Sequence, residues 1–186
     1  RSATMNYAGF QSLTVELMDG VAHVIIDNPP INLFDLVLYP EMVRLSAELR
    51  DDEDVRAVVV SSENPEFFIA HFDVSLILQL PTGRPAPVVL SDFHQMCENF
   101  RTMPKPTICA IDGRVGGGGS EVTLSMDMRF ASPRAVFSQP EVALGIIPGG
   151  SGTVRLPRLV GRSRALEVVL GSEDIDAATA EKWGWV

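Results

Sequence analysis

The stretch Gly113-Arg114-Val115-Gly116-Gly117-Gly118-Gly119-Ser120-Glu121 decides how this chain is interpreted. Its four consecutive glycines follow the apolar segment Thr107–Ile111 and precede Ser120–Met126, which has the composition of a helix start. Glycine adopts backbone conformations closed to other residues and lets the backbone approach a neighbour closely. At a strand-to-helix junction, such a run leaves free amides at the positive end of the helix dipole. Those amides suit either a phosphate or a developing oxyanion.

The residues after the glycines favour the oxyanion. A phosphate-binding loop continues with Gly-Lys-Ser/Thr, whereas this chain continues with Ser120-Glu121, and a carboxylate repels phosphate. We therefore expect Glu121 to carry out proton chemistry beside the amides. Tight packing of a helix on a strand explains the glycines equally well when they are taken alone. A serine–histidine–acid triad through Ser120 and His71 is disfavoured, because Ser120 lacks a Gly-x-Ser-x-Gly setting.

A second carboxylate, Glu141, opens a short apolar segment after Gln139-Pro140. Negative charge is favourable at a helix N-terminus. The residues that follow, through Ile147, are nearly all apolar, and if they surround Glu141 they would raise its pKa into the range of a working acid or base. A carboxylate exposed to water at a helix N-terminus is the alternative.

A third segment, Phe68-Ile69-Ala70-His71-Phe72-Asp73, has the pattern of a strand that enters a helix. Asp73 is of a residue type that caps helix N-termini. The backbone amide of Phe72 lies at this junction and is a candidate second oxyanion donor.

The rest of the chain reads as a mixed α/β protein. Two β-branched runs around Asp19-Gly20 predict a hairpin, and the apolar run 55–60 predicts a buried parallel strand. The predicted elements are strands at 13–17, 21–26, 55–60, 67–69, 107–111, 129–132 and 135–138, and helices at 39–50, 74–80, 88–103, 153–160, 163–170 and 176–183.

Several other features are interpreted as structural. The run Asp51-Asp52-Glu53-Asp54 is predicted to be a solvated loop, because it lacks the spacing of a metal site. His23 and His94 are expected to be structural side chains of a strand and a helix. The segment Pro81–Pro87 is predicted to be a mobile loop.

Composition excludes several classes of protein. The 186 residues are 46% hydrophobic and 21% charged, which is typical of a globular domain. Two cysteines are too few for a disulfide framework and predict buried thiols in a cytoplasmic protein. No apolar run approaches the length of a membrane span. The net charge of −9 argues against nucleic-acid binding, and no residue spacing predicts a metal site. Residues 1–11 are interpreted as a tail or expression remnant.

Together the three motifs resemble the crotonase, or enoyl-CoA hydratase/isomerase, superfamily over residues 12–186. The stretch 113–121 is similar to the family's Gly-x-Ala-x-Gly-Gly-Gly-x-Glu motif, and 68–73 is similar to its Phe-x-Ala-Gly-x-Asp segment. Further matching segments, in chain order, are 25–30, 55–61, 137–141, 145–152, 156–161 and 175–177. The resemblance implies a spiral of strand-strand-helix units with a parallel-strand core. Family members continue into a C-terminal helical region that usually builds trimers or pairs of trimers, and this region is expected to be missing here.

The resemblance also implies roles for individual residues. The amides of Phe72 and Gly118 would form an oxyanion hole for the thioester carbonyl of an acyl-CoA. Glu121 would activate water for addition at C3, and Glu141 would handle the proton at C2. Coenzyme A would enter only as part of the substrate, with no permanently bound cofactor. By the same resemblance, Ala70, Asp73 and Gly117 are the expected substrate-binding residues.

Three residues depart from the family pattern, and alternatives stay open. His71 replaces a glycine, which puts a standard hydratase rate in doubt. Val115 replaces a frequent alanine, and Phe72 is larger than the usual small residue, although only its amide is needed. The presence of both glutamates favours a hydratase over a Δ3,Δ2-enoyl-CoA isomerase or another family reaction. An alternative from a different class of function is a non-catalytic scaffold that binds CoA or a partner.

Overall fold

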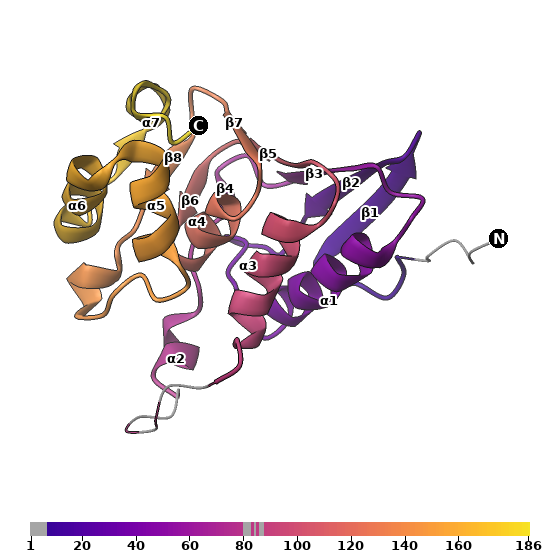
Figure 1. Ribbon diagram of the computed structural model, residues 1–186, viewed down its shortest axis with the longest axis horizontal. Coiled ribbons are helices and arrows are strands. Elements are labelled where there is room, and N and C mark those ends of the chain that lie inside the picture. Colours follow the sequence, from indigo (N-terminus) through magenta and orange to yellow (C-terminus); the bar gives the residue numbers. More distant parts are fainter. Residues whose placement is uncertain (1–6, 80–82, 84, 86–87) are drawn as a thin grey trace.

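A computed structural model places the chain in two β-sheets with helices around them (Figure 1). It describes residues 7–79, 83, 85 and 88–186. The first sheet has the order β1-β2-β3-β5-β7, and its strands are Leu13–Met18, Val21–Ile26, Ala57–Ser62, Thr107–Ile111 and Met128–Ala131. The β1–β2 pair is antiparallel and the other pairs are parallel. The predicted hairpin is confirmed, with both Asp19 and Gly20 at positive φ in its turn.

The second sheet has the order β4-β6-β8-β9. Its strands are short: Phe67–Ile69, Arg114–Gly116, Val136–Ser138 and Ile175–Asp176. The first three run parallel, and β9 pairs antiparallel with β8. Of these strands, β6 and β9 are not predicted from the sequence: β9 is only two residues long, and β6 ends at Gly116, the first glycine of the run that the sequence interprets as a strand-to-helix junction.

The chain alternates between the two sheets. It passes from β3 to β4 and helix α2 (Val74–Ile77), from β5 to β6 and helix α4 (Gly117–Leu124), and from β7 to β8 and the 3₁₀ turn η1 (Glu141–Leu144). This repetition confirms the predicted spiral of strand-strand-helix units around a parallel core. It also corrects one prediction: the glycine run does not directly follow Thr107–Ile111, because Arg114–Gly116 first forms a strand of the second sheet.

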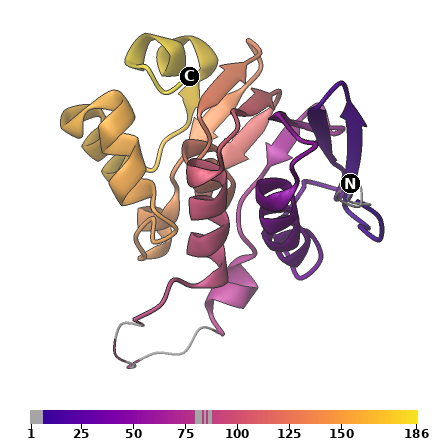
Figure 2. The ribbon, with the colours of Figure 1, turned by 45° about the vertical axis from the view of Figure 1, so that its right-hand side comes forward.

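The remaining helices form two groups. Helix α1 (Leu38–Asp51) and helix α3 (Asp92–Thr102) lie side by side in both ribbon views (Figures 1 and 2). Helices α5 (Gly152–Val160), α6 (Arg162–Gly171) and α7 (Ala177–Trp183) lie at the end of the molecule opposite the β1–β2 hairpin (Figure 2). Among the described residues, no helix is both long and apolar enough to cross a membrane.

The prediction of a helix over 88–103 is wrong at its start. Helix α3 begins at Asp92, because the Ser91 hydroxyl accepts the backbone N–H of His94 and caps the helix there. Val88, Val89 and Leu90 are exposed and lie outside it. The loop predicted over Pro81–Pro87 falls mainly on residues 80–82, 84 and 86–87, which lie outside the described part of the chain.

The prediction of a solvated acidic loop is wrong for Asp52. Its side chain is buried and accepts a hydrogen bond of 2.6 Å from the Tyr7 hydroxyl. Residues near the chain start therefore pack on α1, and the carboxylate gains a partner that sequence proximity does not reveal. Among residues 7–79, 83, 85 and 88–186, no cluster of His, Cys, Asp and Glu side chains could hold a metal ion.

Helix α4 is the most enclosed element of the fold, since every residue from Gly117 to Leu124 is buried. It begins against strand β4. A Cβ atom on Gly119 would lie 2.6 Å from Cγ2 and 2.8 Å from the backbone oxygen of Ile69. No side chain fits between these two elements, so glycine at this position sets the distance from α4 to the second sheet.

This contact generates a stability prediction. We expect Gly119→Ala to lower the free energy of unfolding by about 2 kcal/mol, because the added methyl group meets strand backbone that cannot move aside cheaply. Gly171→Ala is the matched control, since its Cβ would have only an ordinary 3.8 Å contact with Glu173. Urea unfolding of both variants measures the difference. An equal stability for the two would show that α4 is not held this closely.

Candidate active site

A cavity of 550 Å³ opens where α3, α4, η1 and the segment after β4 meet. Its lining is mainly apolar and aromatic, with few polar side chains. The lining residues are Tyr39, Phe72, Ile77, Ser91, Phe93, His94, Gly118, Glu121, Glu141, Ile146, Ile147, Gly149 and Gly150. All four residues that the sequence assigns to catalysis and the oxyanion hole are among them.

Glu121 projects from the second turn of α4 and is 4% exposed. Its Oε1 accepts a hydrogen bond of 2.8 Å from the backbone N–H of Gly152, the first residue of α5. A Cβ atom on Gly150 would overlap the Glu121 carboxylate. The carboxylate is therefore enclosed by a glycine backbone on one side and faces the cavity on the other.

The environment of Glu121 favours its neutral form. Burial raises the pKa of this carboxyl to about 8, and the nearby charge of Glu141 acts in the same direction. The backbone groups of Gly152 and Gly150 and the charge of Arg155 oppose the rise. Desolvation is the largest of these effects, so the environment of Glu121 favours the uncharged form of one carboxyl in this cavity.

Glu141 is the first residue of η1 and is 8% exposed. Burial raises the pKa of its carboxyl, and a hydrogen bond from the side chain of Gln139 opposes the rise. Gln139 donates from Nε2 to both carboxylate oxygens, at 3.1 Å and 3.3 Å. On the glycine side, a Cβ atom on Gly117 would lie 3.3 Å from Oε1 of Glu141. The start of α4 thus packs against Glu141, and Glu121 projects from the next turn of the same helix.

Two backbone amides are placed to face the same cavity. Gly118 is the second residue of α4, where a helix has no internal partner for its N–H. Phe72 forms a parallel bridge with Phe34, in which Phe34 N–H donates to His71 and Asp73 N–H donates to Phe34. Because alternate amides of an extended segment point to opposite sides, the Phe72 N–H points away from Phe34. A Cβ atom on Gly118 would lie 3.2 Å from Cβ of Phe72, so the two residues are neighbours.

Aromatic rings cover the cavity beside these amides. Tyr39 and Phe72 pack edge to face with ring centroids 5.3 Å apart, and Phe93 lies 6.2 Å from each of them. Phe34 packs behind this group. The rings make this wall of the cavity apolar, and electrostatic interactions are stronger beside apolar surroundings than in water.

Comparison with known proteins identifies the family. Residues 16–186 match the enoyl-CoA hydratase/isomerase family over nearly the whole chain. The chain belongs to this family. Solved structures agree: an enoyl-CoA hydratase from Geobacillus kaustophilus is 30% identical with a TM-score of 0.86, and the match covers 96% of this chain and 68% of that one.

Two further members of the same structural group are similar to this chain. An enoyl-CoA hydratase from Bacillus anthracis is 28% identical with a TM-score of 0.85, and the match covers 95% of this chain and 69% of that one. The protein DspI from Pseudomonas aeruginosa is 31% identical with a TM-score of 0.84, and the match covers all of this chain and 75% of that one. These matches confirm the predicted crotonase architecture.

Within this crotonase fold, the three predicted substrate-binding residues lie just outside the cavity lining. The Asp73 side chain caps α2 by accepting from the N–H and hydroxyl of Ser75. Ala70 is buried, and Gly117 lies at positive φ in the first turn of α4. Their contact with a substrate stays a prediction. His71 also lies outside the lining, and its Nδ1 is 2.8 Å from the Phe72 carbonyl oxygen.

Several residues that line the cavity are not predicted from the sequence. Tyr39 and Phe93 are aromatic residues on the apolar faces of α1 and α3, where the sequence indicates only core packing. Gly149 and Gly150 fall in a segment that the sequence predicts as a loop. His94, which the sequence predicts to be structural, lines the cavity and hydrogen-bonds to the carbonyl oxygen of Gly149. Its position beside the apolar stripe of a helix is the one feature of the sequence that could have indicated a place in the cavity wall.

The buried proton on Glu121 predicts a pH-dependent stability. Because the folded-state pKa lies above the unfolded value, the unfolded chain releases this proton first as pH rises from about 4.5 to 8. Over that window the group lowers the stability of the fold by about 1.4 kcal/mol per pH unit. We expect Glu121→Gln to remove this loss, so the variant gains stability over the native protein as pH rises toward 8.

Thermal unfolding at pH 5, 6, 7 and 8 measures the effect. The control is Glu16→Gln, which changes an exposed carboxylate on β1. The difference between the native protein and Glu121→Gln should widen with pH, and the control should show no such trend. A constant difference across the four pH values would contradict the burial of an uncompensated carboxyl group.

Proposed function

We propose that this protein adds water across the C2–C3 double bond of a 2-enoyl-CoA to give a 3-hydroxyacyl-CoA. The observation that carries the proposal is the convergence of two buried carboxylates, Glu121 and Glu141, on one apolar cavity with two candidate amide donors. Membership of the enoyl-CoA hydratase/isomerase family supports the same chemistry.

The amides of Phe72 and Gly118 are proposed to bind the thioester carbonyl oxygen. Addition of hydroxide at C3 moves an electron pair through C2 to this oxygen and forms an enolate. Fixed N–H donors in a dry site stabilise that charge without reorganisation, and each such donor is worth about 3 kcal/mol in the transition state. The Gly118 amide adds the positive end of the α4 dipole.

The two glutamates are proposed to move the two protons. Glu121 accepts a proton from water as its oxygen bonds to C3, and Glu141 delivers a proton to C2 as the enolate collapses. This exchange needs one proton on the pair at the start, and it leaves one proton on the pair at the end. Burial of both groups and the charge of Glu141 near Glu121 favour a pair that shares one proton at neutral pH, and in the reacting form this proton is on Glu141 while Glu121 is a carboxylate. Proton exchange with solvent then restores the starting state.

The acyl group is proposed to lie along the aromatic wall. Tyr39, Phe72 and Phe93 offer apolar surface next to the proposed oxyanion hole. Coenzyme A enters as part of the substrate, and its contacts with Ala70, Asp73 and Gly117 are part of the proposal. Residues 84–186 carry 11 basic and 11 acidic residues, whereas residues 1–83 carry 4 basic and 13 acidic residues. The CoA phosphates are therefore expected to meet arginines of the second half, a neighbouring subunit, or the C-terminal helical region that family members carry.

An assay of crotonyl-CoA hydration tests the proposal, and the loss of the enoyl absorbance measures the reaction. Glu121→Gln and Glu141→Gln should each lower kcat by about 10²- to 10⁴-fold, because each removes one proton-transfer group and keeps the shape of the site. Glu167→Gln, an exposed change on α6, should leave kcat unchanged.

The same assay separates the alternatives. A protein that converts 3-enoyl-CoA to 2-enoyl-CoA and does not consume the 2-enoyl product would be an isomerase. Binding of crotonyl-CoA with no turnover of either substrate, over several chain lengths, would indicate a scaffold. Full activity in Glu121→Gln would contradict the two-carboxylate mechanism.

The pH profile gives an independent prediction. If the singly protonated pair is the active form, kcat/KM falls as pH rises through about 8, where the pair loses its proton. It also falls on the acid side, where the second carboxylate takes up a proton. Initial rates at subsaturating crotonyl-CoA from pH 5 to 10 measure both limbs. A rate that continues to rise above pH 9 would contradict a proton held by the pair.

A further inference from the structure

The segment from Gly149 to Gly152 joins the loop after η1 to helix α5 and contacts Glu121. Gly152 donates its N–H to the carboxylate at 2.8 Å, and a side chain on Gly150 would collide with it. This segment has no regular secondary structure until α5 begins at Gly152. The position of the Glu121 carboxylate therefore depends on what holds these four residues in place.

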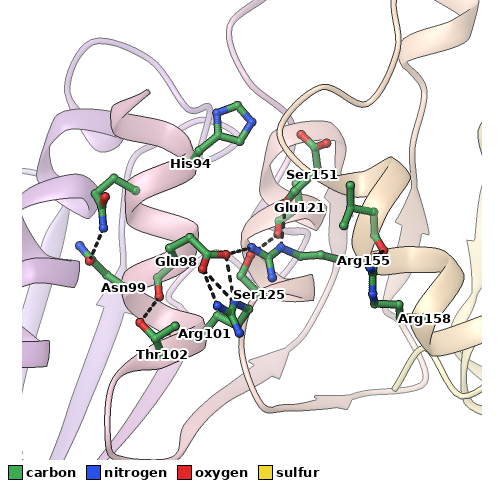
Figure 3. Close-up of polar contacts among 12 residues, drawn as sticks. His94, Glu98, Asn99, Arg101, Thr102, Glu121, Ser125, Ser151, Arg155 and Arg158 are labelled. Carbon is green, nitrogen blue, oxygen red and sulfur yellow. Dashed lines mark hydrogen bonds and ion pairs between the residues drawn. The ribbon is translucent and has the colours of Figure 1, made fainter. Parts of the chain in front are cut away.

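One attachment of the segment comes from His94 on α3. Its Nε2 lies 2.8 Å from the carbonyl oxygen of Gly149, and its Nδ1 lies 2.7 Å from the hydroxyl of Ser91. A carbonyl oxygen only accepts hydrogen bonds, so Nε2 must carry a proton and donate it. The Ser91 hydroxyl fixes the ring from the other side. Figure 3 shows His94 on α3 on the same side of the helix as Glu98.

The second attachment comes from Glu98, one turn further along α3. Arg155 donates from Nη2 to Glu98 at 2.7 Å and from Nε to the hydroxyl of Ser151 at 2.8 Å (Figure 3). The Arg155 side chain is only 14% exposed. The hydrogen bond from Arg101, and after it the one from Arg155, holds the pKa of Glu98 down, at about 2. The ion pair is therefore present at every pH at which the protein would act.

Ser151 itself indicates that the segment is held under constraint. Its φ of 99° lies in the left-handed region, which is unfavourable for a non-glycine residue and persists only where the surroundings enforce it. The hydroxyl that Arg155 binds belongs to this residue. Glycine would adopt this left-handed conformation at a lower cost in free energy, but it would lack the hydroxyl group to which Arg155 donates.

We propose that His94 and the Glu98–Arg155 pair are positioning residues that clamp Gly149–Gly152 at both ends and thereby hold the carboxylate of Glu121. The clamp acts on geometry first. Release of either end would loosen the Gly152 N–H contact with Glu121 and allow the carboxylate to turn in the cavity. Its effect on turnover rests on the proposed hydratase function, whereas its effect on Glu121 does not.

Titration of the Glu121 carboxyl carbon by NMR tests the clamp without any substrate. The resonance is assigned by its disappearance in Glu121→Gln. His94→Leu removes the donor and keeps an apolar side chain in the cavity wall, and we expect the Glu121 midpoint to rise by about one pH unit as the amide contact weakens. His94→Gln retains an N–H donor and should restore most of the native midpoint.

A control histidine and a second variant keep the test decisive. His23→Leu changes a half-buried histidine on β2, remote from the cavity lining, and should leave the midpoint unchanged. Ser151→Gly removes the hydroxyl and relieves the left-handed backbone, so it should fold at least as stably as the native protein. It should nevertheless raise the Glu121 midpoint, which a merely structural role would not do.

Crotonyl-CoA kinetics then connects the clamp to turnover. His94→Leu and Ser151→Gly should lower kcat by about tenfold, with little change in KM, because misplacement of a reacting group slows chemistry more than binding. An unchanged Glu121 midpoint in folded His94→Leu or Ser151→Gly overturns the clamp, as does an equal shift in His94→Leu and His94→Gln. Absence of hydratase activity with a shifted midpoint would overturn the proposed function and leave the clamp standing.

Discussion

The close contact between the start of α4 and the segment that follows β4 is the constraint on which this structure depends. Gly119 packs against the backbone of Ile69, and Gly118 lies beside Phe72. Larger residues would push the helix away from the sheet. The contact brings Gly118 and Phe72 side by side, and it carries Glu121, two residues beyond Gly119 on α4, into the interior. The geometry of the cavity follows from the absence of side chains at these positions.

The same contact lies beside two carboxyl groups in the interior, where their burial lowers the stability of the fold. Glu121 and Glu141 are both buried, and neither forms an ion pair among the described residues. Backbone amides and Gln139 offset only part of the desolvation. Buried carboxyls with raised pKa values concentrate at catalytic sites. The burial of large apolar residues, including Phe68, Phe100 and Trp185, stabilises the fold and offsets the free energy lost by burying the two carboxyl groups.

Much of this arrangement could be predicted from local patterns. The glycine run predicts a close approach, the Pro140-Glu141 turn predicts a carboxylate at a helix start, and residues 68–73 predict a strand followed by a cap. The strands β6 and β9 could not be predicted, because β9 has only two residues and β6 ends within the glycine run, which by itself indicates a turn. The burial of Asp52 depends on Tyr7, which lies 45 residues away in the chain. His94 reaches Gly149 across 55 residues, and nothing near either residue indicates that contact.

In the proposed mechanism, the amides of Phe72 and Gly118 polarise a thioester carbonyl. Difference infrared spectroscopy of crotonyl-CoA with a ¹³C-labelled thioester carbonyl, bound to the slow variant Glu121→Gln, observes this interaction directly. Two N–H donors at 2.7–3.1 Å lengthen the carbonyl bond. If both amides donate to the carbonyl oxygen, the C=O stretch lies at lower wavenumber in the complex than in water. A stretch at or above its aqueous position, with the ligand fully bound, would contradict it.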